Sequence, residues 1–260
     1  MRFDVITLFP ELFAPFLTSG INRRAFSSGQ VDVRLWNPRD HADGNYRRVD
    51  DRPFGGGPGM VMMAEPLYRC WSAIRADRAE AEPAPTVLFS PAGRRLDHPA
   101  VAAQAGGPGA ILVCGRYEGI DQRFIDACVD DQLSLGDFVL SGGEIAAIAL
   151  LDAVARLQPG VLNDAGSHQQ DSFNPALDGL LDCPHYTRPE VWEGPRGAEG
   201  VPAVLLSGHH AQVESWRREQ RLRQTARVRP DVLAAVRAAG GLSKGDEAYL
   251  RQHPLDSGKN

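Results

Sequence analysis

The sequence has few of the features that mark secreted, zinc-binding or membrane proteins. Its four cysteines (Cys70, Cys114, Cys128 and Cys183) are widely separated and form no C-x-x-C pair. This argues against a disulfide framework and against a zinc site, and it fits a reducing cytosol. The best apolar run, within residues 145–151, is far shorter than the roughly 20 residues that span a bilayer. We therefore expect a cytoplasmic protein without a membrane partner.

Familiar nucleotide and hydrolase motifs are missing as well. Neither G-x-x-x-x-G-K-[ST] nor G-x-S-x-G occurs, and the glycine runs at 55–59 and 106–109 are each interrupted by proline. A P-loop, a dinucleotide site of the Rossmann type and a nucleophile elbow are therefore disfavoured. The seven histidines form no H-E-x-x-H motif, which disfavours a zinc hydrolase.

The net charge of −5 indicates no overall preference for nucleic acid. Residues 211–229, however, hold two acids and six arginines: Arg217, Arg218, Arg221, Arg223, Arg227 and Arg229. A local basic stripe can bind phosphates on an acidic protein. A solvated helix face explains the same charge pattern and is the more frequent case, so both interpretations stay open.

The first half of the chain alternates between stretches typical of β-strands and stretches typical of helices. Residues 3–8, 31–36, 86–90, 110–114 and 138–140 predict short strands, with helices beginning at Pro10, around Pro66 and after Ser141. Ser141 and Glu144 have the spacing of a capping box for a helix that runs to about Leu157. Such alternation predicts an α/β fold with a parallel sheet.

The remaining sequence predicts a second, helical part. Residues 161–175 are polar and rich in turn-forming residues, which is typical of a flexible linker. We therefore divide the chain into an N-terminal α/β parallel-sheet domain (1–160), a linker (161–175) and a smaller helical C-terminal domain (176–260).

Loops at the predicted strand ends are the best candidates for a ligand site. They lie at 90–91, 114–119 and 135–143, and two of them carry acids. Ligands of open α/β sheets bind outside the carboxyl ends of the strands, where glycines let the backbone approach a flat ring. Each glycine alone is more simply a turn, but three such loops together predict a small-molecule site.

Four long blocks of the sequence resemble a known family. They are VDDRPFGGGPGM (49–60), VCGRYEGID (113–121), GDFVLSGGE (136–144) and LDCPHYTRP (181–189). They are similar to those of the bacterial tRNA (guanine-N1)-methyltransferases, which belong to the knotted SPOUT class. The resemblance extends from residue 3 to about residue 229.

The resemblance implies a deep trefoil knot in the α/β domain, with S-adenosylmethionine bound in the knot loops. It also implies an antiparallel homodimer with active sites at the subunit interface, a C-terminal domain that binds tRNA, and methylation of N1 of the guanosine at position 37. By the same resemblance the cofactor-binding residues are Pro91, Gly115, Tyr117, Glu118, Leu135, Gly136, Asp137, Phe138, Val139, Leu140 and Gly142.

The resemblance further implies a general base at Asp171 and a catalytic arginine at Arg156. A carboxylate can take the proton of guanine N1, and a guanidinium can stabilise negative charge on O6. Structural roles explain the same residues: Arg156 as a cation at a helix C-terminus and Asp171 as a helix N-cap.

Two other functions stay open at this point. One is a knotted methyltransferase that acts on another RNA position, and the other is an RNA-binding module with a vestigial cofactor pocket. The sequence does not settle whether Mg²⁺ takes part, and no residue is assigned as a metal ligand.

Overall fold

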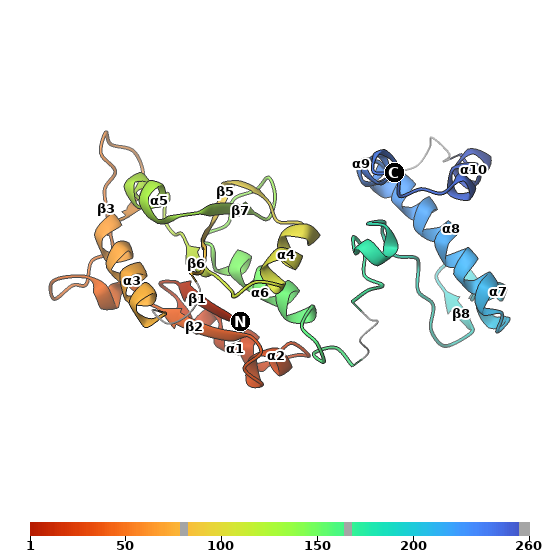
Figure 1. Cartoon of the computed structure of the whole chain (residues 1–260), viewed down its shortest axis with the longest axis horizontal. Coiled ribbons are helices and arrows are strands. Elements are labelled where there is room, and N and C mark those ends of the chain that lie inside the picture. The colour runs from red at the N-terminus through yellow and green to blue at the C-terminus, as the bar shows by residue number, and fades with distance from the viewer. Residues whose placement is uncertain (79–82, 164–167, 255–260) are drawn as a thin grey trace. The chain divides into compact units, whose positions relative to one another are not determined.

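Five short strands of the first half pair into one parallel sheet with the order β2-β1-β6-β5-β7. The strands are β1 (Arg2–Ile6), β2 (Asp32–Trp36), β5 (Thr86–Arg95), β6 (Ile111–Cys114) and β7 (Asp131–Ser134). The computed structural model describes residues 1–78, 83–163 and 168–254. The chain divides into two compact units, Met1–Asn163 and Asp164–Asn260. The predicted α/β fold with a parallel sheet is confirmed (Figure 1).

Helices cover both faces of this sheet. They are α1 (Ala14–Thr18), α2 (Arg23–Ser27), α3 (Ala64–Asp77), α4 (His98–Ala105), α5 (Gln122–Cys128) and α6 (Glu144–Arg156). In Figure 1, α3 and α5 lie on one side, with α4 and α6 on the other. The unit is completed by 3-10 turns at Pro10–Leu12 (η1) and Pro38–His41 (η2) and by a short hairpin of β3 (Asp50–Asp51) and β4 (Val61–Met62).

The apolar runs of the central strands explain this layering. In β6, Leu112 and Cys114 pack into the cluster that contains α6, whereas Ile111 and Val113 pack into the cluster that contains α3. Successive strand residues point to opposite faces, so a strand that is covered on both sides must be apolar throughout. Four consecutive apolar residues are therefore enough to place β6 at the centre.

The predicted strand at 138–140 is wrong. Phe138 is 54% exposed and Val139 is 83% exposed, and both belong to a loop. The fifth strand is instead β7, which begins with two polar residues, Asp131 and Gln132. Because of them, the sequence shows no apolar run that would predict a strand here. As an edge strand, β7 is hydrogen-bonded only to β5, so it needs few apolar residues.

The second unit is mainly helical. It contains α7 (Ala203–Leu206), α8 (His210–Val228), α9 (Pro230–Ala238) and α10 (Lys244–Gln252), preceded by a 3-10 turn, η3 (Pro175–Leu177). A hairpin of β8 (Val191–Gly194) and β9 (Gly197–Gly200) was not predicted. Of the predicted linker, residues 164–167 lie outside the described residues, as does the chain end at 255–260.

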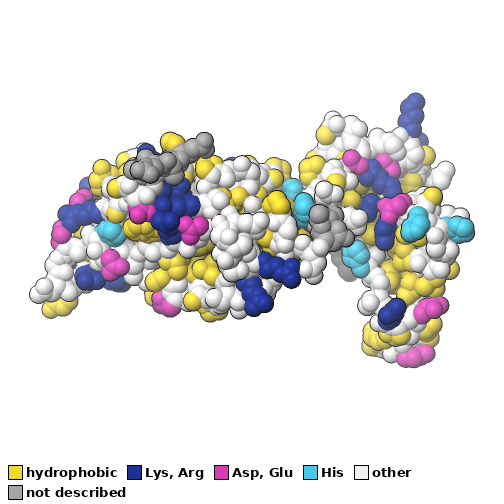
Figure 2. Space-filling model, turned by 60° about the horizontal axis from the view of Figure 1, so that its bottom comes forward, with side chains coloured by type: hydrophobic (Ala, Val, Ile, Leu, Met, Phe, Trp, Pro, Cys, Tyr) yellow, Lys and Arg dark blue, Asp and Glu magenta, His cyan; other side chains and the backbone are white. Residues whose placement is uncertain are grey.

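The arginines of α8 do not form one continuous exposed stripe. Arg218 contacts Asp178 and Asp246, and its hydrogen bond to Asp246 lowers the pKa of that carboxyl to about 2. Arg221 is only 8% exposed because α8 turns this side chain toward Asp182. Arg223 and Arg227 remain on the exposed face. On the face in Figure 2, basic side chains likewise lie in small groups, often beside acidic ones.

In the described part of the chain, no helix has both the length and the apolar character that a membrane span requires.

A buried ion-pair network joins the sheet to α3. Asp4 is fully buried and accepts hydrogen bonds from Arg78 Nε at 2.5 Å, Arg2 Nη2 at 2.7 Å and Trp36 Nε1 at 2.8 Å. At the exposed end of the network, Arg34 Nη1 lies 2.8 Å from Asp77. Loss of one partner of a buried charge strongly destabilises the fold, whereas an exposed ion pair contributes little to the free energy of unfolding.

We expect Arg78→Ala to lower the free energy of unfolding by about 3 kcal/mol, because it removes a buried partner of Asp4. Arg34→Ala is the matched control, and its loss should stay below about 1 kcal/mol. Urea denaturation of both variants measures the difference. If the two variants lost the same free energy of unfolding, burial of the Asp4 network would add nothing to stability.

Candidate functional site

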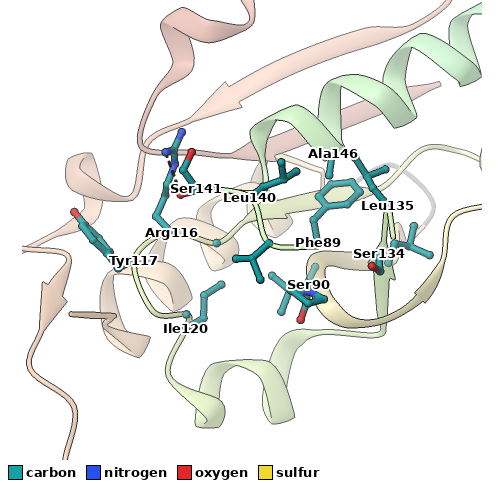
Figure 3. Close-up of a pocket in the computed structure, with 18 of the residues that line it drawn as sticks. Phe89, Ser90, Arg116, Tyr117, Ile120, Ser134, Leu135, Leu140, Ser141 and Ala146 are labelled. Atoms are coloured by element: carbon teal, nitrogen blue, oxygen red, sulfur yellow. Dashed lines mark hydrogen bonds between the residues drawn. The ribbon is translucent and has the colours of Figure 1, made fainter. Parts of the chain in front are cut away.

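A pocket of about 450 Å³ opens at the carboxyl ends of β5, β6 and β7 (Figure 3). Its lining comes from the middle of β5, the loop after β6, and the end of β7 with the loop that follows it, together with Ile125 of α5 and Ala146 of α6. The volume lies within the range of small-molecule sites, and the position is the one where open α/β sheets bind ligands. The three segments from which the sequence predicts a small-molecule site therefore border one cavity.

A β-bulge shapes the first loop. The register of β5 against β7 shifts between Phe89 and Arg94, and Pro91 in this stretch lines the pocket. Gly93 permits the bend, since a Cβ there would lie 2.5 Å from the backbone of Gln132. Bulges of this kind commonly redirect a strand next to a ligand site.

The second loop contains a strained residue. Tyr117 has a φ of 59°, in the left-handed region that favours glycine. Backbone hydrogen bonds hold the loop there: Glu118 N–H donates to Met60 O at 3.0 Å, and Met62 N–H donates to Gly119 O at 2.9 Å. Desolvation and the neighbouring Asp50 carboxylate raise the pKa of the Tyr117 hydroxyl, so it stays neutral. Figure 3 shows its ring pointing away from the other labelled residues.

A buried ion pair holds the third loop against the second. Glu144 is 1% exposed, and its Oε1 accepts hydrogen bonds from Thr7 Oγ1 at 2.9 Å and Arg116 Nε at 3.2 Å. Arg116 Nε is also 3.0 Å from Oε2, but that contact lacks hydrogen-bond geometry. Arg116 Nη1 donates to Ser141 O at 3.2 Å. Arg116 thus joins the loop after β6 to α6 and to the loop before α6, and Glu144 adds a bond to Thr7, just after β1.

This ion pair shows why the predicted capping box is wrong. The N-cap of α6 is Gly143, and no side chain caps the helix. The carboxylate of Glu144 is directed to Arg116 and Thr7 instead of back to the backbone near Ser141. A charged partner that is distant in sequence therefore outcompetes the local cap.

Two glycines bring the backbone before α6 close to the end of β6. Gly143 N–H donates to Gly115 O at 3.0 Å, and a Cβ on Gly143 would lie 2.8 Å from Cys114 Cα. A Cβ on Gly142 would lie 2.5 Å from Arg116 Cδ and from Glu144 Oε2. Only glycine fits at either position without movement of the neighbours.

Most of the cofactor-binding residues proposed from the sequence lie together in this pocket. The nine that line it are Pro91, Gly115, Tyr117, Glu118, Leu135, Phe138, Val139, Leu140 and Gly142, whereas Gly136 and Asp137 do not line it. Sequence reasoning missed Arg116 and Ser134 among the lining residues. Arg116 stood within a recognised block, and Ser134 was overlooked because β7 was not predicted.

The two proposed catalytic residues lie outside this set. Arg156 is the last residue of α6, a 13-residue helix whose first residue, Glu144, is at the pocket. The helix places Arg156 about 18 Å from Glu144. Asp171 belongs to the second unit. The expectation that Asp171 caps a helix is wrong, because Asn174 is the N-cap of η3.

No cluster of three or more histidine, cysteine or acidic side chains suited to a metal ion occurs in residues 1–78, 83–163 and 168–254. All four cysteines are free and buried. Burial raises the pKa of the Cys114 thiol, beside the pocket, well above its usual range. The thiol is therefore protonated and unreactive.

The fold and the pocket define an α/β protein with a small-molecule site at the ends of its parallel strands. A family model described as tRNA (Guanine-1)-methyltransferase TrmD matches residues 1–235. The tRNA (guanine-N(1)-)-methyltransferase of Paracidovorax citrulli is 75% identical over 96% of this chain and 97% of the relative. The protein of that name from Albidiferax ferrireducens is 71% identical over 96% and 98%. The chain belongs to the tRNA (guanine-1)-methyltransferase family and is a methyltransferase, which confirms the resemblance.

Proposed function

We propose that the protein transfers a methyl group from S-adenosylmethionine to N1 of the guanosine at position 37 of tRNA, on the 3′ side of the anticodon. The observation that carries this proposal is the pocket itself. It is built from the blocks 113–121 and 136–144, which resemble the family, at the strand ends where this fold class binds ligands.

The pocket suits a molecule with a flat ring and an apolar edge. Its walls are mostly apolar, and at Gly115 and Gly142 no side chain separates the backbone from a bound ring, so an adenine can approach it closely. When bound, S-adenosylmethionine supplies an electrophilic methyl group on its sulfonium. Glu118 is the only carboxylate among the described lining residues and is the one candidate there as a ligand for Mg²⁺.

A deep trefoil knot accounts for the way in which α6 is held. The chain passes from β7 back to the end of β6, where residues 142–143 are bonded to residues 115–116. In a knotted chain this passage runs through the loop that other segments form. The close fit of Gly143 against Cys114 supports such threading.

The chemistry follows from guanine itself. N1 carries a proton, so its lone pair is available to attack a methyl carbon only as that proton leaves. We assign this step to the Asp171 carboxylate, which takes the N1 proton as the N1–CH₃ bond forms and the S–CH₃ bond breaks. Arg156 stabilises the negative charge that moves onto O6.

A second copy of the chain would complete the site. Arg156 lies about 18 Å from the pocket end of α6, which is farther than an arginine side chain reaches. An antiparallel homodimer places the Arg156 of one subunit near the pocket of the other. The exposed Phe138, Val139 and Ile145 beside the pocket provide apolar surface for this interface.

Each of the three parts of the chain then has its own role in the reaction. Domain 1–160 binds the methyl donor, the linker 161–175 carries Asp171, and domain 176–260 binds tRNA. The substrate places the enzyme in the cytoplasm.

We expect Asp171→Asn to slow methyl transfer by about 10²–10⁴-fold and Arg156→Ala by about 10²–10³-fold, because they remove the base and the O6 partner. The assay incubates tRNA carrying guanosine or adenosine at position 37 with labelled S-adenosylmethionine, and the product nucleoside is identified. Modification that persists with adenosine 37 would indicate a methyltransferase for another RNA position.

We expect Gly142→Val to abolish S-adenosylmethionine binding, because the added side chain displaces Arg116 at the pocket wall. Gly106→Val is the control, since a Cβ there meets its nearest neighbour at 3.6 Å. Calorimetric titration and thermal unfolding are measured on both. If the wild-type protein itself bound no S-adenosylmethionine, an RNA-binding module with a vestigial pocket would be the better assignment.

We expect the double substitution Arg223→Ala and Arg227→Ala to weaken binding of all tRNAs and to flatten the log–log salt dependence by roughly one unit per arginine. These two side chains lie on the exposed face of α8, where phosphates can reach them. Arg221→Ala should instead lower stability, because Arg221 is buried beside Asp182. If the salt dependence of the double variant were unchanged, the arginines of α8 would be a solvated helix face and would not bind phosphates.

A further inference from the structure

The segment that carries Asp171 is folded around the side chain of Asn174. Asn174 Nδ2 donates to His168 O at 2.9 Å, and Oδ1 accepts from Ala176 N–H at 2.9 Å. Because one amide atom faces a carbonyl and the other faces an N–H, the orientation of the amide is unambiguous. The side chain is 9% exposed, so both bonds are shielded from water.

The backbone of Asn174 continues this arrangement. Asn174 N–H donates to Asp171 O at 3.2 Å, and Asp171 N–H donates to His168 O at 3.3 Å. His168 O therefore receives both Asp171 N–H and the Asn174 side chain. Phe173, between them, has a φ of 68°, a conformation that persists only where its surroundings enforce it.

This turn is anchored in the second unit. Phe173 N–H donates to Leu180 O at 2.9 Å, and Asp182 N–H donates to Ser172 Oγ at 2.9 Å. Leu177 and Leu180 are buried, and Leu180 belongs to the core between α8 and α9. Within the predicted linker, residues 168–175 are thus joined by hydrogen bonds to one another and to residues 180–182, on both sides of Asp171.

We propose that Asn174 is a positioning residue for methyl transfer, whose side chain sets the backbone of Asp171 so that the carboxylate meets guanine N1. This inference rests on the proposed function, in which Asp171 is the general base. Asn174 need not touch tRNA or the cofactor. A displacement of a catalytic group by about 1 Å can slow a reaction by roughly 100-fold.

The test uses Asn174→Ala and Asn174→Asp in the full-length protein. Asn174→Ala removes both side-chain bonds. Asn174→Asp keeps an acceptor for Ala176 N–H but points a carboxylate oxygen at His168 O, so it breaks the contact with the Asp171 turn alone. Both variants should slow single-turnover methyl transfer by about 10- to 100-fold. Affinities for tRNA and S-adenosylmethionine should stay within about twofold.

Ser243→Ala is the matched control. Ser243 caps α10 in the same unit, with its Oγ accepting from Asp246 N–H at 3.1 Å. This variant should lower Tm about as much as Asn174→Ala does, without any loss of rate. A similar rate loss in Ser243→Ala, an unchanged rate in Asn174→Ala, or a fall in tRNA affinity that matches the rate loss would each overturn the proposal.

A double-mutant cycle separates this proposal from the one on which it rests. If Asn174 acts through Asp171, Asn174→Ala should have no further effect in the Asp171→Asn background. Additive rate losses would overturn the positioning role. A wild-type rate in Asp171→Asn alone would instead overturn the assignment of Asp171 as the base, whatever Asn174→Ala does.

Discussion

The structure of the pocket depends on one buried ion pair, Arg116 with Glu144. Burial of either charge depends on the other, and Thr7 Oγ1 and the Ser141 carbonyl add one hydrogen bond each, to Glu144 Oε1 and from Arg116 Nη1. The pair joins the start of α6 to the loop after β6. It holds those two loops at the separation that leaves a cavity between them.

Close backbone contact makes this arrangement specific. Glycines at 142 and 143 let the chain before α6 lie directly against the end of β6, and Gly93 does the same for the bulge in β5. Each of the three would clash with a neighbour if it carried a side chain. At Gly142 and Gly143 the pocket wall is backbone, and apolar side chains line most of the rest, a combination that suits a flat ring whose edge presents hydrogen-bonding groups.

The proposed reaction draws on residues of both units. The proposed donor pocket lies at the sheet, whereas the proposed base lies in a turn that hydrogen bonds of Asn174 and Leu180 hold within the second unit. Arg156 stands at the far end of α6 from the pocket. Catalysis in this scheme requires the parts to be assembled, which couples methyl transfer to dimer formation and tRNA binding.

The sequence alone determined the parallel α/β sheet, and its resemblance to the family singled out nine residues that line the pocket. Runs such as 111–114 are apolar at every position, and glycine-rich blocks follow the strands. Tertiary structure decided β7, the ion pair of Glu144, the burial of Arg221 and the N-cap at Asn174. Each of these depends on a partner that is remote in sequence or on the face that a helix turns to the core. Local patterns carry no information about such partners, because the contact forms only when the chain folds.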